Sequence, residues 1–193
     1  MTTRHAAVLL ADGFEEIEAV SVIDILRRAG VVVLTLSIGD NPLVRGAHDI
    51  SVKVDARMAD AGGRTFDAVV LPGGMPGSAN LGESATVREL LRRTHASGGI
   101  VAAVCAAPLV LHAAGLLAGK RVTSFPGVAA KLTGATYTGK RTEQDGRIVT
   151  GQAAGSAIEF ALAVVAALGM PEKGEALRGA LLLTPDEVRP HPP

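Results

Sequence analysis

The segment from Gly98 to Gly115, GGIVAAVCAAPLVLHAAG, decides the fold that we predict for this chain. Its first half is apolar and free of charge after a glycine pair, which is typical of a strand buried on both faces of a sheet. Its second half is rich in Ala and Leu and ends at Gly115, and this pattern predicts a helix. Pro108 lies near the first helical turn, where its missing N–H costs nothing. Cys105, the only cysteine, is therefore predicted on the turn between strand and helix.

Such a turn is typical of a nucleophile elbow, which holds one side chain out above the sheet. Helix-end amides near the sulfur favour the thiolate, so we expect Cys105 to have a lowered pKa. The alternative interpretation is an inert core thiol, the usual state of a lone cysteine. The carboxyl end of a strand is where α/β proteins build their sites, and this favours a functional Cys105.

The rest of the chain alternates between strand-like and helix-like segments, without an internal repeat or a linker. We expect strands at 6–11, 31–37, 49–54, 66–71 and 122–124. We expect helices at about 15–29, 78–96, 155–168 and 172–183, and a short helix that ends at 133. A hairpin should join 136–143 to 147–150 through Asp145 and Gly146. This alternation predicts a single α/β domain, a three-layer α/β/α sandwich with a mainly parallel central sheet.

The first predicted helix carries an acidic residue on its apolar face. Glu18 falls within the arc of apolar positions, so its pKa should be raised by burial. Either the carboxyl only bonds a backbone group, or it faces a site at the strand ends. Ile17 and Val20 lie among charged residues on the opposite side, which indicates a homodimer contact or a solvated charged face.

The glycine-rich segment 72–77, PGGMPG, follows a predicted buried strand. It lacks the spacing and the lysine of a phosphate loop. Its glycines would let backbone N–H groups approach a ligand closely, as an oxyanion site requires, while a simple turn explains them equally well. His48 lies in a polar loop, where we expect an exposed imidazole without a partner.

Composition excludes several classes of function. The formal net charge is +0 and aromatic residues make up 3% of the chain, which argues against a nucleic-acid partner. The longest apolar run, 160–170, is too short to span a bilayer. The five histidines and one cysteine show no metal-ligand spacing. We therefore expect a soluble cytoplasmic protein that binds no cofactor, metal or membrane.

Four segments resemble the ThiJ/PfpI superfamily, the family of the parkinsonism-associated protein deglycase, and most closely its bacterial YajL-like branch. They are ADGFEEIE at 11–18, VLPGG at 70–74, AVCAAP at 103–108 and GSAIEFA at 155–161. The resemblance covers about residues 5 to 185. It implies a flavodoxin-like fold related to class I glutamine amidotransferases, with one domain over 1–188, a disordered Pro-rich tail over 189–193 and assembly as a homodimer.

The resemblance also implies roles for individual residues. Cys105 matches the reactive cysteine of the family, and Glu18 matches the protonated glutamate that hydrogen-bonds it. Gly73, Gly74 and Ala106 match positions whose backbone N–H groups line the oxyanion pocket.

Three predicted substrate-binding positions depart from other members of the family. Phe125 stands where many members have a histidine, although YajL-like members also have phenylalanine there. His48 stands where the animal deglycase has an arginine that reaches the partner's site, and Ala154 replaces a proline that borders the pocket. These changes imply a pocket of different shape.

The resemblance implies a cysteine-dependent stress-response protein that converts methylglyoxal or glyoxal to lactate or glycolate and removes early glycation adducts from proteins. One alternative is a redox-sensing chaperone without turnover, in which the thiol oxidises to a sulfinic acid. Another is a ThiJ/PfpI-type cysteine hydrolase or peptidase. That reading needs a histidine base, and Phe125 and the absence of a His-x-Glu pair after the elbow argue against it.

Overall fold

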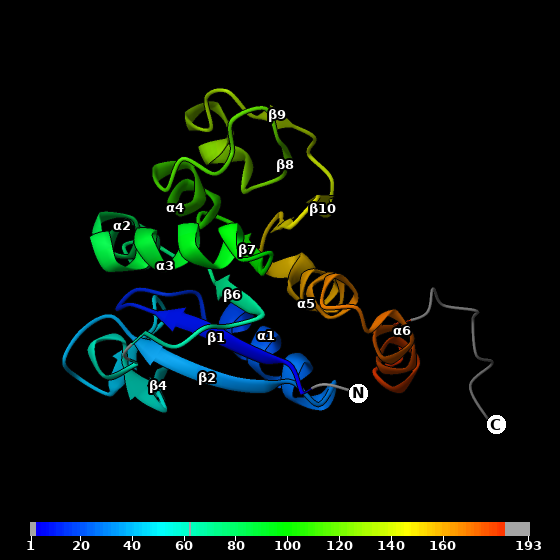
Figure 1. Ribbon diagram of the computed structural model, residues 1–193, viewed down its shortest axis with the longest axis horizontal. Helices are drawn as coiled ribbons and strands as arrows, with labels where there is room; N and C mark the ends of the chain where they lie inside the picture. The colour runs from blue at the N-terminus through cyan, green and yellow to red at the C-terminus, as the bar shows by residue number, and fades with distance from the viewer. Residues whose placement is uncertain (1–2, 62, 184–193) are drawn as a thin grey trace.

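The computed structural model describes residues 3–61 and 63–183, in which seven strands form one twisted sheet (Figure 1). Their order across the sheet is β10-β11-β7-β6-β1-β2-β5, and all pairs are parallel except β10 with β11. The strands are β1 (His5–Leu10), β2 (Val32–Ser37), β5 (Ala56–Arg57), β6 (Ala68–Leu71), β7 (Ile100–Val104), β10 (Thr142–Asp145) and β11 (Ile148–Gly151). The predicted sandwich with a mainly parallel sheet is confirmed.

Helices cover both faces of this sheet (Figure 1). One layer consists of α1 (Glu16–Arg28), α5 (Ala157–Ala167) and α6 (Pro171–Ala180), and the other of α2 (Gly77–Glu83), α3 (Ala85–Ala96) and α4 (Pro108–Ala113). Successive side chains of β1 point to opposite faces of the sheet and pack against the two helix layers alternately. Val8 and Leu10 pack in the core of α1 and α5, and Ala7 and Leu9 pack in the core of α3 and α4. This double burial explains why the central strands are apolar throughout.

Four strands form two small separate sheets. β3 (Leu43–Arg45) pairs antiparallel with β4 (Ser51–Lys53), and β8 (Arg121–Val122) pairs parallel with β9 (Thr136–Tyr137). The strands predicted at 49–54 and 122–124 therefore exist, but neither belongs to the central sheet. Three short 3-10 helices, η1 (Met58–Asp60), η2 (Pro126–Lys131) and η3 (Ala154–Ser156), complete the described elements.

Three further predictions need correction. The single helix expected at 78–96 is two helices, because Ser84 is extended and its side chain caps α3 by accepting from Val87 N–H at 3.3 Å. The hairpin of β10 and β11 is confirmed, but its register places Gly146 and Arg147 in the turn. Residues 136–137 belong to β9, and the edge strand β5 was not expected. The predicted tail at 189–193 lies outside the described residues.

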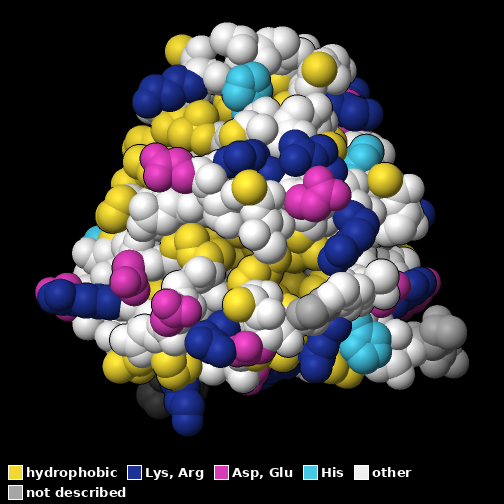
Figure 2. Space-filling view, turned by 60° about the vertical axis from the view of Figure 1, so that its left-hand side comes forward, with side chains coloured by type: hydrophobic (Ala, Val, Ile, Leu, Met, Phe, Trp, Pro, Cys, Tyr) yellow, Lys and Arg dark blue, Asp and Glu magenta, His cyan; other side chains and the backbone are white. Residues whose placement is uncertain are grey.

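The surface in Figure 2 carries basic and acidic side chains intermixed, as the balanced composition predicts. Ile17 and Val20 are exposed on α1, as predicted. In the described part of the chain, the helices are all too short or too polar to cross a membrane.

Candidate active site

Cys105 lies on a strained turn directly after β7. Its backbone has φ +61°, a left-handed conformation that is uncommon for residues other than glycine. Neighbouring segments hold the turn in place: Cys105 N–H donates to Gly151 O at 3.0 Å, and Phe125 N–H donates to Cys105 O at 2.8 Å. α4 begins three residues later with Pro108 in its first turn. The predicted elbow is confirmed, and its thiol is half-buried.

Glu18 projects from the first turn of α1 toward this elbow and is fully buried. Its Oε2 accepts a hydrogen bond of 2.7 Å from Gly73 N–H. Its Oε1 is buried without a nitrogen or oxygen partner among the described residues. The Cys105 thiol lies close enough to the Glu18 carboxyl for each group to shift the pKa of the other, so this acid has a backbone donor on one side and the sulfur near it.

Two glycines allow β6 to approach the pair closely. A Cβ on Gly73 would lie 2.7 Å from Cys105 Cβ and 2.7 Å from Glu18 Oε2. Gly74 has φ +89°, and a Cβ there would lie 2.4 Å from Glu15 N. Neither position has room for a side chain, so the glycines are required by close approach as well as by backbone conformation.

The amides around the sulfur divide into two roles. The N–H groups of Ala106 and Gly74 act on the Cys105 sulfur and lower the pKa of the thiol. These two residues therefore lie where the sequence predicted an oxyanion pocket. Gly73 N–H donates to Glu18 instead of facing the thiol, which corrects its predicted place in that pocket.

The pKa values of the pair move in the same direction. Burial raises the pKa of Glu18 to about 7, as its place on the apolar face predicted. Burial, followed by the charge of Glu18 and the hydrogen bond to it, raises the pKa of the Cys105 thiol to about 12. The expected lowering of the thiol pKa is therefore wrong for the free protein, because burial and a neighbouring acid outweigh two amide donors.

A pair of this kind loses its first proton near neutral pH and its second only in strong alkali. It then carries a single negative charge over a wide pH range, with one proton held between the sulfur and the carboxyl, because a second charge in the same buried space is disfavoured. Glu18 is then in position to accept that proton when the sulfur attacks an electrophile. The arrangement suits a nucleophile with its own local base, without a histidine.

The remaining predicted site residues differ in their exposure and in their contacts with the Cys105 turn. Phe125 is half-exposed and adjoins the elbow through its amide. Ala154 is partly buried in η3, after β11, the strand whose end at Gly151 bonds Cys105. His48 is exposed, but it is not free of partners, because Nδ1 lies 2.8 Å from Glu16 Oε2.

Glu16 is a buried acid that the sequence pattern did not reveal. Its Oε1 accepts from His48 N–H at 2.6 Å, and this bonding lowers the pKa of Glu16 although burial alone would raise it. The Glu16 hydrogen bond and charge raise the pKa of His48. The ligand atoms of Glu15, Glu16 and His48 lie within 4.8 Å of one another, but the pairing of Glu16 with His48 accounts for this cluster without an ion.

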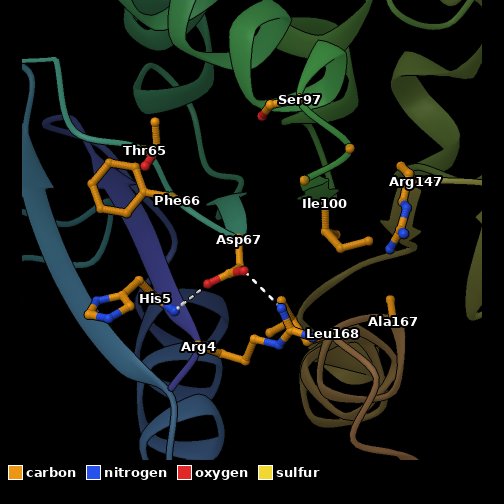
Figure 3. A pocket seen from close by; sticks show the side chains of 12 residues that line it. Arg4, His5, Thr65, Phe66, Asp67, Ser97, Ile100, Arg147, Ala167 and Leu168 are labelled. Atoms are coloured by element: carbon orange, nitrogen blue, oxygen red, sulfur yellow. Dashed lines mark hydrogen bonds and ion pairs between the residues drawn. The ribbon is translucent and has the colours of Figure 1, made fainter. Parts of the chain in front are cut away.

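A cavity of about 540 Å³ lies at the opposite edge of the sheet, at the amino ends of the strands (Figure 3). Asp67 there accepts from Arg4 at 3.0 Å and from His5 N–H at 2.8 Å. Binding sites of α/β sheets lie at the carboxyl ends of the strands, where Cys105 is found. We therefore assign the candidate site to the Cys105 edge.

Comparison with known proteins agrees with this geometry. The sequence profile of the DJ-1/PfpI family matches residues 4–167. The chain is 38% identical over 183 residues to protein dj-1beta of Drosophila melanogaster, covering 94% of this chain and 98% of the relative. The crystal structure of that relative superposes with a TM-score of 0.91 and 37% identity, over 95% of this chain and 100% of the other.

Two further relatives have informative names. Glutathione-independent glyoxalase DJR-1.2 of Caenorhabditis elegans is 36% identical over 187 residues, covering 95% of this chain and 99% of the relative. An oxidized form of Toxoplasma gondii DJ-1 superposes with a TM-score of 0.90 and 35% identity, over 93% of this chain and 98% of the other.

Proposed function

This chain belongs to the DJ-1/PfpI family, and from that premise we propose that it is a stress-response enzyme of the DJ-1 type in which Cys105 detoxifies reactive dicarbonyls. The substrates are 2-oxoaldehydes such as methylglyoxal and glyoxal, and the products are the 2-hydroxy acids lactate and glycolate. Removal of early glycation adducts from proteins would use the same groups. The relative named a glutathione-independent glyoxalase supports this chemistry.

The first step joins the sulfur to the aldehyde carbon. Glu18 accepts the thiol proton while the sulfur attacks, and a hemithioacetal oxyanion forms. The N–H groups of Gly74 and Ala106, which lower the pKa of the thiol in the free protein, are the groups that we assign to stabilise that oxyanion. Glu18 in its neutral form then returns the proton to the oxygen.

The second step moves hydrogen between the two carbons. Glu18 removes the proton from the former aldehyde carbon, and the electron pair forms the carbon–carbon double bond of an enediolate. The hydroxyl proton of the first carbon passes to the oxygen of the second, and Glu18 returns its proton to the second carbon. The aldehyde carbon is thereby oxidised to a thioester and the ketone carbon reduced to an alcohol, with no external oxidant or reductant. Water then hydrolyses the thioester, which releases the hydroxy acid and restores the thiol.

One observation carries the proposal: the buried Oε1 of Glu18 has no nitrogen or oxygen partner among the described residues, while the same carboxyl contacts the thiol. An acid serving only to hold the backbone would need only its bond to Gly73 N–H. The second oxygen beside a half-exposed sulfur is placed for proton transfer.

The test is lactate formation from methylglyoxal. We expect Cys105→Ser and Glu18→Gln each to lower kcat/KM by at least ~100-fold, since one removes the nucleophile and the other the base. Glu172→Gln, an exposed acid on α6, serves as the matched control and should retain full activity. Equal lactate formation by the wild type and the two site variants would overturn the enzymatic proposal.

A redox sensor without turnover is the second candidate function, and the half-exposed thiol favours it. A protonated Glu18 could donate to a sulfinate on Cys105 and stabilise that oxidation state. The oxidized structure of a relative supports this possibility. Intact mass after peroxide treatment tests it: a gain of two oxygens in the wild type, absent from Cys105→Ser, is expected, and an unmodified wild type would contradict it.

A homodimer is the assembly that we propose. Ile17 and Val20 are exposed apolar residues on α1, beside the loop in which His48 bonds Glu16. Apolar side chains at such a position favour a self-complementary contact.

A further inference from the structure

We propose that Met75 and Phe125 form an apolar rim beside Cys105, and that this rim selects uncharged 2-oxoaldehydes with an apolar substituent. The inference rests on the proposed function and names the substrate class more closely. It concerns the part of the substrate that does not react, which the thiol and Glu18 leave unspecified.

Backbone connections place both residues beside the turn that carries the sulfur. Met75 directly follows Gly74, whose N–H lowers the pKa of the Cys105 thiol. Phe125 N–H donates to the carbonyl of Cys105 itself at 2.8 Å. Thus one apolar residue adjoins the turn after β6, and the other adjoins the elbow after β7.

Both side chains are unusually exposed for their type. Met75 is 56% exposed and Phe125 is 48% exposed, whereas the other large apolar residues of β6, β7 and α4 are mostly buried in the core. Apolar groups left in solvent beside a nucleophile gain free energy when a ligand covers them. Methionine adapts its shape to varied apolar groups, and an aromatic ring offers a flat surface for stacking.

The position of the Phe125 ring is supported by its own loop. A Cβ on Gly127 would lie 3.1 Å from Cε1 of that ring, so the glycine provides room for the ring against the start of η2. Tyr137 donates from its hydroxyl to Ser124 O at 3.4 Å and adds a second partly exposed aromatic residue beside this loop. A ring held in this way loses little further freedom when a substrate contacts it.

The charge near the thiol disfavours anionic substrates. The charged group that acts on Cys105 is Glu18, an acid, and the charge of Glu15 in turn acts on Glu18. The nearby imidazole of His48 is paired with Glu16. A carboxylate or phosphate on the substrate would therefore be repelled by the charge of Glu18. The rim and the charge together favour a neutral apolar substituent.

Turnover of a matched substrate pair tests the rim. We expect the wild type to convert phenylglyoxal to mandelate with a kcat/KM at least ~10-fold above that for 4-carboxyphenylglyoxal, which adds only a carboxylate. Met75→Ala and Phe125→Ala should each lower the ratio of kcat/KM for phenylglyoxal to that for methylglyoxal by at least ~5-fold. Val32→Ala, a half-exposed apolar residue at the amino end of β2, should leave the ratio unchanged.

A second measurement separates this inference from the proposed function, because it needs no turnover. The rate of Cys105 alkylation by N-benzyliodoacetamide should exceed that by iodoacetamide, and the excess should fall in both rim variants but not in Val32→Ala. If no hydroxy acid forms from any substrate but Cys105 still reacts faster with the benzyl reagent, the result contradicts the proposed enzymatic function and supports the apolar rim. If the wild type shows no preference for the benzyl reagent, or all three variants respond alike, the rim is overturned.

Discussion

At the residue scale, the site depends on two acids that share one charge. Burial raises the pKa of Glu18, and contact with Cys105 lowers it in part. Burial and the charge of Glu18 both raise the pKa of the Cys105 thiol, since two negative charges in a buried space repel. Backbone N–H groups stabilise the single negative charge on either group. Gly73 N–H acts on the carboxylate, and the N–H groups of Gly74 and Ala106 act on the sulfur. In the proposed reaction, attack on an aldehyde removes the proton from sulfur and passes it to Glu18, so the pair needs no separate base.

The stability of the folded protein should depend on pH through Glu18. Burial raises its folded pKa to about 7 from an ordinary value of 4.5, so the folded state holds this proton more tightly than the unfolded state. The resulting stabilisation is fully present below pH 4.5 and is lost as the pH rises through 7, a change on the order of 3 kcal/mol.

Urea unfolding of the wild type and Glu18→Gln at pH 5 and pH 8 measures this change. Glutamine keeps an acceptor for Gly73 N–H but cannot ionise, so the wild type should lose stability relative to the variant as the pH rises. Parallel pH profiles for the two proteins would contradict the assignment of the raised pKa.

Gly73→Ala should disrupt the site directly. The added Cβ would lie 2.7 Å from both Cys105 Cβ and Glu18 Oε2, so the carboxyl or the elbow must move. We expect a loss of about 1–3 kcal/mol in the free energy of unfolding and at least ~10-fold in kcat/KM for methylglyoxal. Gly179→Ala, where nothing lies within 4 Å, is the control and should leave both values near wild type. Full activity of Gly73→Ala would show that the close packing is not required.

At the element scale, the site is assembled from the carboxyl ends of neighbouring strands and the first turn of α1. β6 brings the glycines, β7 brings Cys105, α1 brings Glu18, and β11 supports the elbow by accepting from Cys105 N–H. The loop that carries Phe125 is attached to β11 through a buried contact: Thr150 Oγ1 accepts from Thr123 N–H at 2.9 Å. A substitution in β11 can therefore shift the loop that carries Phe125 and so alter the site around Cys105.

Thr150→Val tests this attachment. The substitution preserves shape but leaves Thr123 N–H buried without its acceptor, which should cost about 1–3 kcal/mol of unfolding free energy. Thr133→Val, in which an exposed hydroxyl loses a 3.5 Å contact to His112, should change stability by less than about 0.5 kcal/mol. Thermal denaturation of both variants measures the difference, and equal costs would show that the buried bond contributes nothing particular.

At the scale of the whole molecule, the two edges of the sheet differ in chemistry. The carboxyl edge gathers the thiol, the buried acid and the backbone amides that act on them, whereas the amino edge holds the Arg4–Asp67 pair beside its cavity. The exposed apolar side chains of Ile17 and Val20 on α1 lie apart from the core, and they are the residues of the proposed dimer contact.

Val20→Lys should convert the proposed dimer to a monomer. Val20 is 50% exposed on α1, and a lysine from each copy would place like charges in a shared apolar contact. Val32→Lys alters a valine that is 49% exposed on β2 and should leave the assembly intact. Sedimentation velocity at micromolar concentration distinguishes the two species. A wild type that sediments as a monomer would contradict the dimer itself.

Periodicity and turn chemistry in the sequence were sufficient to predict the sandwich, the elbow at Cys105 and the inward position of Glu18. Those features depend on local patterns: an apolar strand ending at a tight turn, and an acid on the apolar face of a helix. The break at Ser84 was missed because one capping serine interrupts an otherwise continuous helical pattern.

Contacts between distant segments were decided by the tertiary structure alone. Glu16 bonds a residue 32 positions away, and Gly73 N–H donates to an acid 55 positions away, so no local pattern could reveal either partner. The direction in which the pKa of the thiol shifts was also decided by contacts between distant segments. Helix-end amides can be anticipated from the sequence, but burial and the charge of Glu18, which reverse their effect, arise only when the chain has folded.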